Sequence, residues 1–169
     1  MTDTIYALAS GHGRAGIAVM RLSGPQAFAA LAALTPGKPA PPPRQATIRR
    51  LTDPATSHPI DDALVLTFEG PASFTGEDVV EFHLHGGRAI IDGLSACLNK
   101  QDGLRLAEPG EFTRRAFENN RLDLTEAEAV ADLINAETEA QRLQALDQLS
   151  GALKDLYHQW ADRLARALA

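Results

Sequence analysis

The fold of this 169-residue chain is best indicated by the residues Phe74-Thr-Gly-Glu-Asp-Val-Val-Glu-Phe-His-Leu-His-Gly-Gly87. Residues 78–84 form a short apolar run with β-branched and aromatic members, which predicts a strand that ends at the following glycine pair. Residues 88–99 then carry apolar side chains at helical spacing, namely Ile90, Ile91, Leu94, Cys97 and Leu98. A strand therefore gives way directly to an amphipathic helix.

The residues before this stretch predict further strands and one further helix. Residues 4–9 and 16–22 are expected to be two strands joined by a glycine-rich turn. Pro25 fits the first position of a helix, and a proline-rich connector occupies residues 36–43. Residues 46–51 and 62–68 are the next strand candidates. We therefore predict an α+β domain over residues 1–118, with a mixed sheet and its flanking helices on one side.

From residue 119 onward the pattern is purely helical, which predicts a second domain over residues 119–169. Thr125-Glu-Ala-Glu128 is expected to form a capping box at the start of a helix that continues to about Asn135. A stripe of apolar residues then follows at heptad-like spacing, as one long helix: Leu143, Leu146, Leu149, Leu153, Leu156, Trp160 and Leu164. One helix cannot bury this stripe on itself. We expect the first helices of an incomplete, truncated helical domain, or else a dimer whose long helices pair.

Composition and charge limit the classes of function. The chain is 44% hydrophobic and carries 16 Lys and Arg against 22 Asp and Glu, so its net charge is -6. It lacks the broad positive field that binding to a nucleic-acid backbone normally needs. The single cysteine cannot form an internal disulfide, and no charged and then apolar leader or membrane-spanning apolar run is found in the sequence. A cytoplasmic protein that does not enter the membrane is the expectation.

Two nucleotide-binding motifs are weighed and rejected. Residues 11–16 match a Gly-x-Gly-x-x-Gly fingerprint, but Ile-Ala-Val-Met follows and favours a strand, whereas that fingerprint needs a helix. A glycine-rich hairpin turn explains these residues better. The Gly-x-x-x-x-Gly-Lys-Ser/Thr loop of GTPases is absent from the sequence. This chain is therefore not expected to hydrolyse GTP.

Several polar side chains are candidates for a site. Glu81, His83 and His85 alternate along one predicted strand and so share a face, an arrangement that could supply metal ligands. Because no further His or Asp cluster completes a ligand shell, we favour polar residues that face a cleft or a neighbouring strand, and we assign no metal site. Four charged residues around a short helix are interpreted mostly as a solvated face: Glu108, Glu111, Arg114 and Arg115. Arg121 follows this helix where the chain turns, as a site residue or a structural cation. Cys97 is interpreted as an inert buried thiol.

Three blocks of sequence carry a resemblance to a known family. They are residues 74–87, residues 108–134, and an opening formed by Asp3-Thr4-Ile5 with Gly13-Arg-Ala-Gly-Ile-Ala-Val-Met-Arg-Leu-Ser-Gly-Pro25. Together they resemble the N-terminal region of the MnmE (TrmE) family of tRNA modification GTPases, without its GTPase domain. The resemblance spans almost the whole chain. It implies a dimerising, folate-binding domain that is similar in fold to the folate-binding domain of glycine-cleavage aminomethyltransferases.

The resemblance also implies a ligand and its binding residues. The ligand is a tetrahydrofolate derivative, 5-formyl- or 5,10-methylene-tetrahydrofolate, and the matching positions are Arg21, Glu81 and Arg121. A carboxylate such as Glu81 accepts the adjacent N–H and amino groups of a pterin, and arginines suit its oxygens or the carboxylates of the glutamate tail. Many relatives have lysine at the position of Arg121.

For the whole protein the resemblance implies work with the flavoprotein MnmG (GidA) on the wobble uridine of tRNA, giving 5-carboxymethylaminomethyluridine. GTP, magnesium and potassium are then expected only in the missing GTPase domain. This chain would bind folate and form a homodimer, and no catalytic residue is assigned to it. The alternatives are a freestanding folate-dependent aminomethyltransferase-like protein and a dimerisation module without a ligand.

Overall fold

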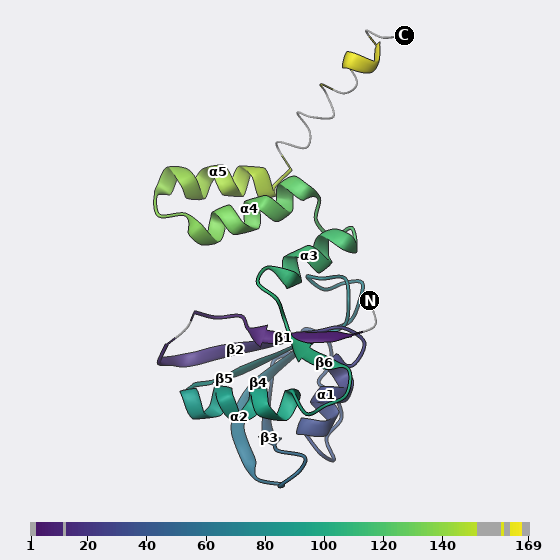
Figure 1. The fold of residues 1–169 in the computed structure, drawn as a ribbon, viewed down its shortest axis with the longest axis vertical. Coiled ribbons are helices and arrows are strands. Elements are labelled where there is room, and N and C mark those ends of the chain that lie inside the picture. Colours follow the sequence, from purple (N-terminus) through teal and green to yellow (C-terminus); the bar gives the residue numbers. More distant parts are fainter. Residues whose placement is uncertain (1–2, 12, 152–159, 161–162, 167–169) are drawn as a thin grey trace. The chain divides into compact units, whose positions relative to one another are not determined.

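The computed structural model describes residues 3–11, 13–151, 160 and 163–166. The chain divides into two compact units, Met1–Phe112 and Thr113–Ala169. The first unit contains the sheet and the helices α1 and α2, and the second contains most of α3 together with α4 and α5 (Figure 1). The domain boundary that we predict between residues 118 and 119 stays a prediction.

The first unit is built on a mixed sheet, as predicted. In the described residues the sheet has six strands in the order β3-β4-β5-β2-β1-β6. All neighbouring pairs are antiparallel except β1 and β6, which are parallel. The strands are β1 (Thr4–Leu8), β2 (Ala15–Ser23), β3 (Thr47–Thr52), β4 (Pro59–Phe68), β5 (Val79–Gly86) and β6 (Leu104–Leu106). The glycine-rich segment after β1 is the connection of the β1–β2 hairpin, as expected from its sequence.

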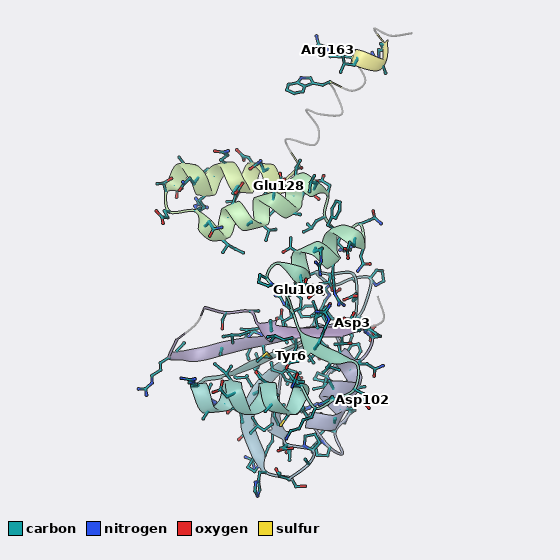
Figure 2. The ribbon with its side chains drawn as sticks, in the orientation of Figure 1. Asp3, Tyr6, Asp102, Glu108, Glu128 and Arg163 are labelled. Carbon is teal, nitrogen blue, oxygen red and sulfur yellow. The ribbon has the colours of Figure 1, made fainter. Side chains whose placement is uncertain are left out.

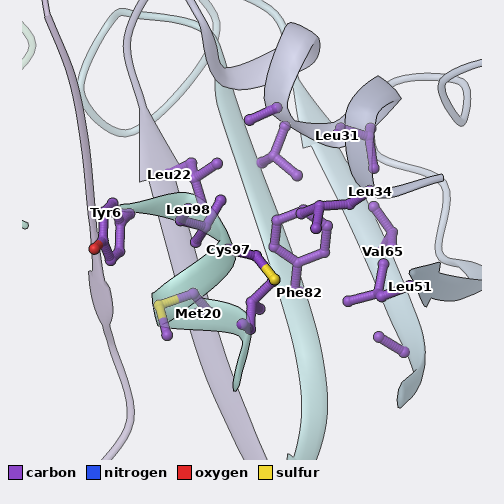
Figure 3. Close-up of a cluster of buried hydrophobic side chains, with 14 of the residues drawn as sticks. Tyr6, Met20, Leu22, Leu31, Leu34, Leu51, Val65, Phe82, Cys97 and Leu98 are labelled. Carbon is purple, nitrogen blue, oxygen red and sulfur yellow. The ribbon is translucent and has the colours of Figure 1, made fainter. Parts of the chain in front are cut away.

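Helices α1 (Ala27–Leu34) and α2 (Arg88–Leu98) contribute to one core with the sheet. The strands alternate buried and less buried side chains, which is the period-2 pattern of a sheet with one covered face. The buried cluster that Figure 3 shows includes Met20, Leu22 and Phe82 from the sheet together with Leu31 and Leu34 of α1. Burial of these side chains is the main stabilising contribution to the first unit.

The predicted buried thiol is confirmed. Cys97 on α2 is a free cysteine, and its side chain is buried in this core (Figure 3). Burial raises the pKa of the Cys97 thiol, because a thiolate would lose its hydration there. The residue therefore behaves as a small hydrophobic side chain, not as a nucleophile.

The loop between β4 and β5, which contains the first residues of the block 74–87, is anchored by buried hydroxyl groups. Ser23 Oγ, at the end of β2, lies 2.6 Å from Thr75 Oγ1 and donates a 2.7 Å hydrogen bond to Glu77 Oε2. Gly76 adopts a φ of 78°, which glycine reaches without steric cost. These bonds fix the loop between β4 and β5 against β2, and Phe74 is held beside that strand.

The interpretation of Glu111 and Arg115 as solvated residues is wrong. Glu111 is 1% and Arg115 is 0% exposed. Glu111 accepts hydrogen bonds from Arg105 on β6 at 2.5 and 2.8 Å, and Arg105 also binds Asp3, which is labelled in Figure 2. The hydrogen bond to Glu111 raises the pKa of the Arg105 guanidinium. The strand β6 was not predicted because three residues give too little pattern, and without it the partner of Glu111 was missing.

Helix α3 (Glu111–Glu118) ends in a Schellman motif. Asn120 has a φ of 56°, its N–H donates to Phe117 O, and the N–H of Arg121 donates to Ala116 O at 2.7 Å. Asparagine is one of the few residues other than glycine that adopt this left-handed conformation readily. The chain thus turns immediately before Arg121, as the sequence indicated.

The second unit continues with α4 (Leu124–Asn135) and α5 (Glu139–Leu149), which pack as a pair. The predicted capping box at Thr125 is wrong: Asp123 caps α4, with Glu126 as its reciprocal partner. Asp123 and Glu126 have the same spacing as Thr125 and Glu128, so the local sequence did not distinguish the two possible capping boxes. Thr138 and Gln141 form a second capping box at the start of α5.

The expected single long helix is interrupted. Helix α5 ends at Leu149, and Gly151 follows with a φ of 89°, a left-handed conformation suited to a helix end. Leu143 and Leu146 of the predicted stripe are exposed on α5. Leu153 and Leu156 lie outside the described residues.

None of the helices among the described residues has the length and apolar character needed to span a membrane. Among the same residues, no group of three or more His, Cys, Asp and Glu side chains is placed to hold a metal ion.

Candidate functional site

The structure brings Arg21 and Glu81 together. The two residues are directly opposite each other in the antiparallel pairing of β2 with β5. Arg21 Nε donates to Glu81 Oε1 at 2.8 Å, and Arg21 Nη2 lies 2.7 Å from the same oxygen. The side chains are 27% and 14% exposed, so this is a largely desolvated ion pair rather than a surface one. Such pairs hold their geometry well, because breaking them leaves a charge without compensation.

Two aromatic rings hold the guanidinium of Arg21. The Arg21 Cζ atom lies 5.5 Å from the ring centre of Phe74 and 5.6 Å from that of Phe112. Both distances are within the range of a cation–π interaction. Neither phenylalanine is predicted to be a site residue from its sequence pattern. Phe74 begins the conspicuous block 74–87, but its contact with Arg21 depends on how the β4–β5 loop folds back over β2.

The ion pair lies on the sheet face opposite the core, which we call the distal face and define by Val19, Arg21, Leu64, Glu81 and His83. The sheet register aligns Val19, His83 and Leu64 across three neighbouring strands. Their side chains are intermediate in burial. The distal face therefore places a charged pair next to aliphatic side chains, a combination that suits a planar heterocycle with a polar edge.

The two candidate histidines, His83 and His85, differ in their exposure and in the groups that they contact. His83 Nε2 lies 3.5 Å from Glu81 Oε2 and has no hydrogen-bond partner among the described residues. His85 is 71% exposed in its side chain, and its Nδ1 lies 2.8 Å from Asp61 Oδ1, while Asp61 Oδ2 accepts the backbone N–H of His85. His85 therefore belongs to a contact between β4 and β5, and only His83 lies beside the Arg21–Glu81 pair.

Arg121 belongs to the second unit, so the structure relates it only to residues of that unit. Its side chain is exposed, and it lines a hollow of about 530 Å³ together with Phe117, Glu118 and Glu126. Its backbone N–H closes the Schellman motif, which fixes where the side chain starts. The residue is thus available for a ligand, in addition to its place at the helix end.

Two family models match the chain. The model described as "GTP-binding protein TrmE N-terminus" matches residues 4–121, and the model described as "MnmE helical domain" matches residues 124–169. The two matches together leave out only residues 1–3 and residues 122 and 123.

Curated relatives agree with these matches. The tRNA modification GTPase MnmE of Parvibaculum lavamentivorans is 62% identical over 167 residues, which are 99% of this chain and 38% of the relative. The human mitochondrial protein "5-taurinomethyluridine-[tRNA] synthase subunit GTPB3" is 58% identical over 98% of this chain and 34% of its own length. MnmE of Caulobacter vibrioides is 57% identical over 100% of this chain and 37% of its own length. The chain thus spans little more than a third of the length of these relatives.

Proposed function

This chain belongs to the MnmE/TrmE family of tRNA modification GTPases and corresponds to its N-terminal region and part of its helical domain, and from this premise we propose that it binds a tetrahydrofolate one-carbon donor. The ligand is 5-formyl- or 5,10-methylene-tetrahydrofolate. It binds on the distal face at Glu81 and Arg21. By the family pattern, Arg121 is a third residue of the site.

The observation that carries this proposal is the state of the Glu81 carboxylate. Only Oε1 is held by Arg21, and no hydrogen bond to Oε2 is found among the described residues. The carboxylate is 14% exposed and is fixed through Oε1 by the arginine, so Oε2 keeps a set direction and stays open to a ligand. Its free lone pairs match the N–H and amino groups along the edge of a pterin. Charge-assisted hydrogen bonds of this kind are about twice as strong as neutral ones.

The whole protein, in our proposal, works with the flavoprotein MnmG in the cytoplasm on the wobble uridine of tRNA. The folate supplies one carbon atom to the uridine modification. GTP hydrolysis takes place in a domain outside this chain and drives the conformational cycle. The contribution of this chain is to hold the folate and to form a dimer.

Titration calorimetry of this chain with 5-formyl-tetrahydrofolate tests the proposal, in the presence of a metal chelator and without nucleotide. Binding heat that saturates is the expected result. The control titrant is p-aminobenzoylglutamate, which has the tail of folate without the pterin ring and is expected to bind far more weakly. If millimolar folate gives no heat, the folate assignment is wrong and the dimerisation module without a ligand is the better description.

We also propose that the first unit forms the homodimer. Two isoleucines of the sheet, Ile17 on β2 and Ile48 on the edge strand β3, are 64% and 71% exposed, and their burial in a dimer would be favourable. Light scattering is expected to give twice the mass of one chain. A strict monomer at tens of micromolar would contradict the proposal, and a dimer that is lost on deletion of residues 119–169 would place the interface on the helices instead.

A further inference from the structure

The distal face contains a buried nitrogen that the structure leaves without a partner. His83 Nε2 is shielded from solvent and makes no hydrogen bond with any described residue. Glu81 Oε2 lies 3.5 Å from this nitrogen, which is beyond the usual length of an N–H···O hydrogen bond. A buried polar atom without a partner costs free energy, so such atoms in native proteins are rare and call for an explanation.

Glu81 cannot move to satisfy this nitrogen without losing its bond to Arg21. Arg21 binds Oε1 through two of its nitrogens and is itself held by the rings of Phe74 and Phe112. The second oxygen, Oε2, therefore stays beside His83 Nε2. The result is a fixed acceptor next to an unpaired imidazole nitrogen, and both face the same side of the sheet.

We propose that Glu81 Oε2 and His83 Nε2 together bind the lactam edge of the ligand, in which a ring N–H stands beside a ring carbonyl. This inference rests on the proposed folate function and identifies His83 as a further binding residue. A rotation of the His83 ring, whose side chain is 27% exposed, brings Nε2 to the ligand. With the proton of the neutral imidazole on Nε2, His83 then donates to the carbonyl oxygen at position 4 of the pterin. Glu81 Oε2 accepts the N–H at position 3. Both unpaired atoms of the protein then gain partners in one step.

The arrangement predicts a selectivity. A 4-amino-4-deoxy analogue of the same folate replaces the carbonyl with an amino group and removes the N–H at position 3. The acceptor and the donor of the ligand edge are thereby reversed, and the protein's own groups are left unpaired. Sites built to hydrogen-bond one edge discriminate strongly against an analogue that leaves buried polar groups without partners.

The test measures the affinity of the whole chain and of His83→Leu for 5-formyl-tetrahydrofolate and for its 4-amino-4-deoxy analogue. The unmodified chain is expected to prefer the 4-oxo compound. In His83→Leu, affinity for the 4-oxo compound is expected to fall roughly five- to tenfold, the loss of one hydrogen bond, and the preference between the two ligands to fall with it. His83→Gln, which keeps an N–H donor, is expected to restore most of both. His58→Leu, an exposed imidazole in the β3–β4 loop, is the matched control and should change neither.

Two results in a folded His83→Leu variant would overturn the inference: unchanged affinity for the 4-oxo folate, or an equal loss for both ligands, which would indicate packing alone. If the unmodified chain binds no folate, the proposed function falls first and this inference with it. Guanosine has the same lactam edge as the pterin and is therefore the other ligand that this pair of residues could bind. It should bind more weakly than the folate, and tighter binding of guanosine would contradict the choice of a pterin.

Discussion

Glu81→Gln is expected to weaken binding of 5-formyl-tetrahydrofolate roughly ten- to hundredfold, the largest effect on binding that we predict. The substitution keeps the size of the side chain but replaces a charged acceptor by an amide. The ligand loses a charge-assisted hydrogen bond, and Arg21 loses the carboxylate that holds its guanidinium in place. Calorimetry on the purified variant measures the change.

Glu69→Gln is the matched control, because Glu69 is an exposed carboxylate just beyond β4. Its affinity for folate should equal that of the unmodified chain. If Glu81→Gln binds folate as tightly as this control does, Glu81 does not contact the ligand.

Gly24→Ala is expected to lower the free energy of unfolding by about 3 kcal/mol or more. Gly24 has a φ of 133°, a conformation that is open only to glycine. A Cβ atom there would meet Asp3 O at 2.7 Å and Thr4 Cα at 2.8 Å, and both are backbone atoms that cannot swing away. Urea unfolding, followed by circular dichroism, gives the free-energy change.

Gly37→Ala separates the two causes of the stability loss expected for Gly24→Ala, which are backbone strain and steric clash of the added Cβ atom. Gly37 also has a positive φ, 73°, but an added Cβ would meet nothing within 4 Å. Its substitution should therefore show only the backbone strain, about 1 kcal/mol. A Gly24→Ala variant that loses no more stability than Gly37→Ala would mean that β1 and β2 can separate enough to admit a methyl group.

The sequence was sufficient for the order of the elements in the first unit, except for the three-residue strand β6. Glycine clusters mark where strands end, and the change of apolar spacing after Gly87 marks the start of α2. Strand register could not be predicted from the sequence, because it depends on tertiary pairing rather than on any local signal. The sequence placed Arg21 and Glu81 on separate strands, but it did not show that they stand opposite each other.

The wrong predictions share a physical cause. The role of a polar side chain in the fold depends on the partners that it finds and not on its residue type alone. Glu111 is expected at the surface until Arg105 is known to bind it. Asp123 and Thr125 are equivalent as helix caps in sequence, and the structure selects Asp123, whose carboxylate also accepts a hydrogen bond from Thr125 Oγ1. Phe74 and Phe112 became visible only through their contacts with Arg21.

A nuclear magnetic resonance titration of the isotopically labelled chain with 5-formyl-tetrahydrofolate shows where the ligand binds. Binding on the distal face is expected to shift the Arg21 Nε–H signal, the His83 imidazole and neighbouring amides on β2 and β5. Saturating shifts that cluster instead around the hollow of about 480 Å³ lined by Leu8, Arg14 and Arg88 would contradict it.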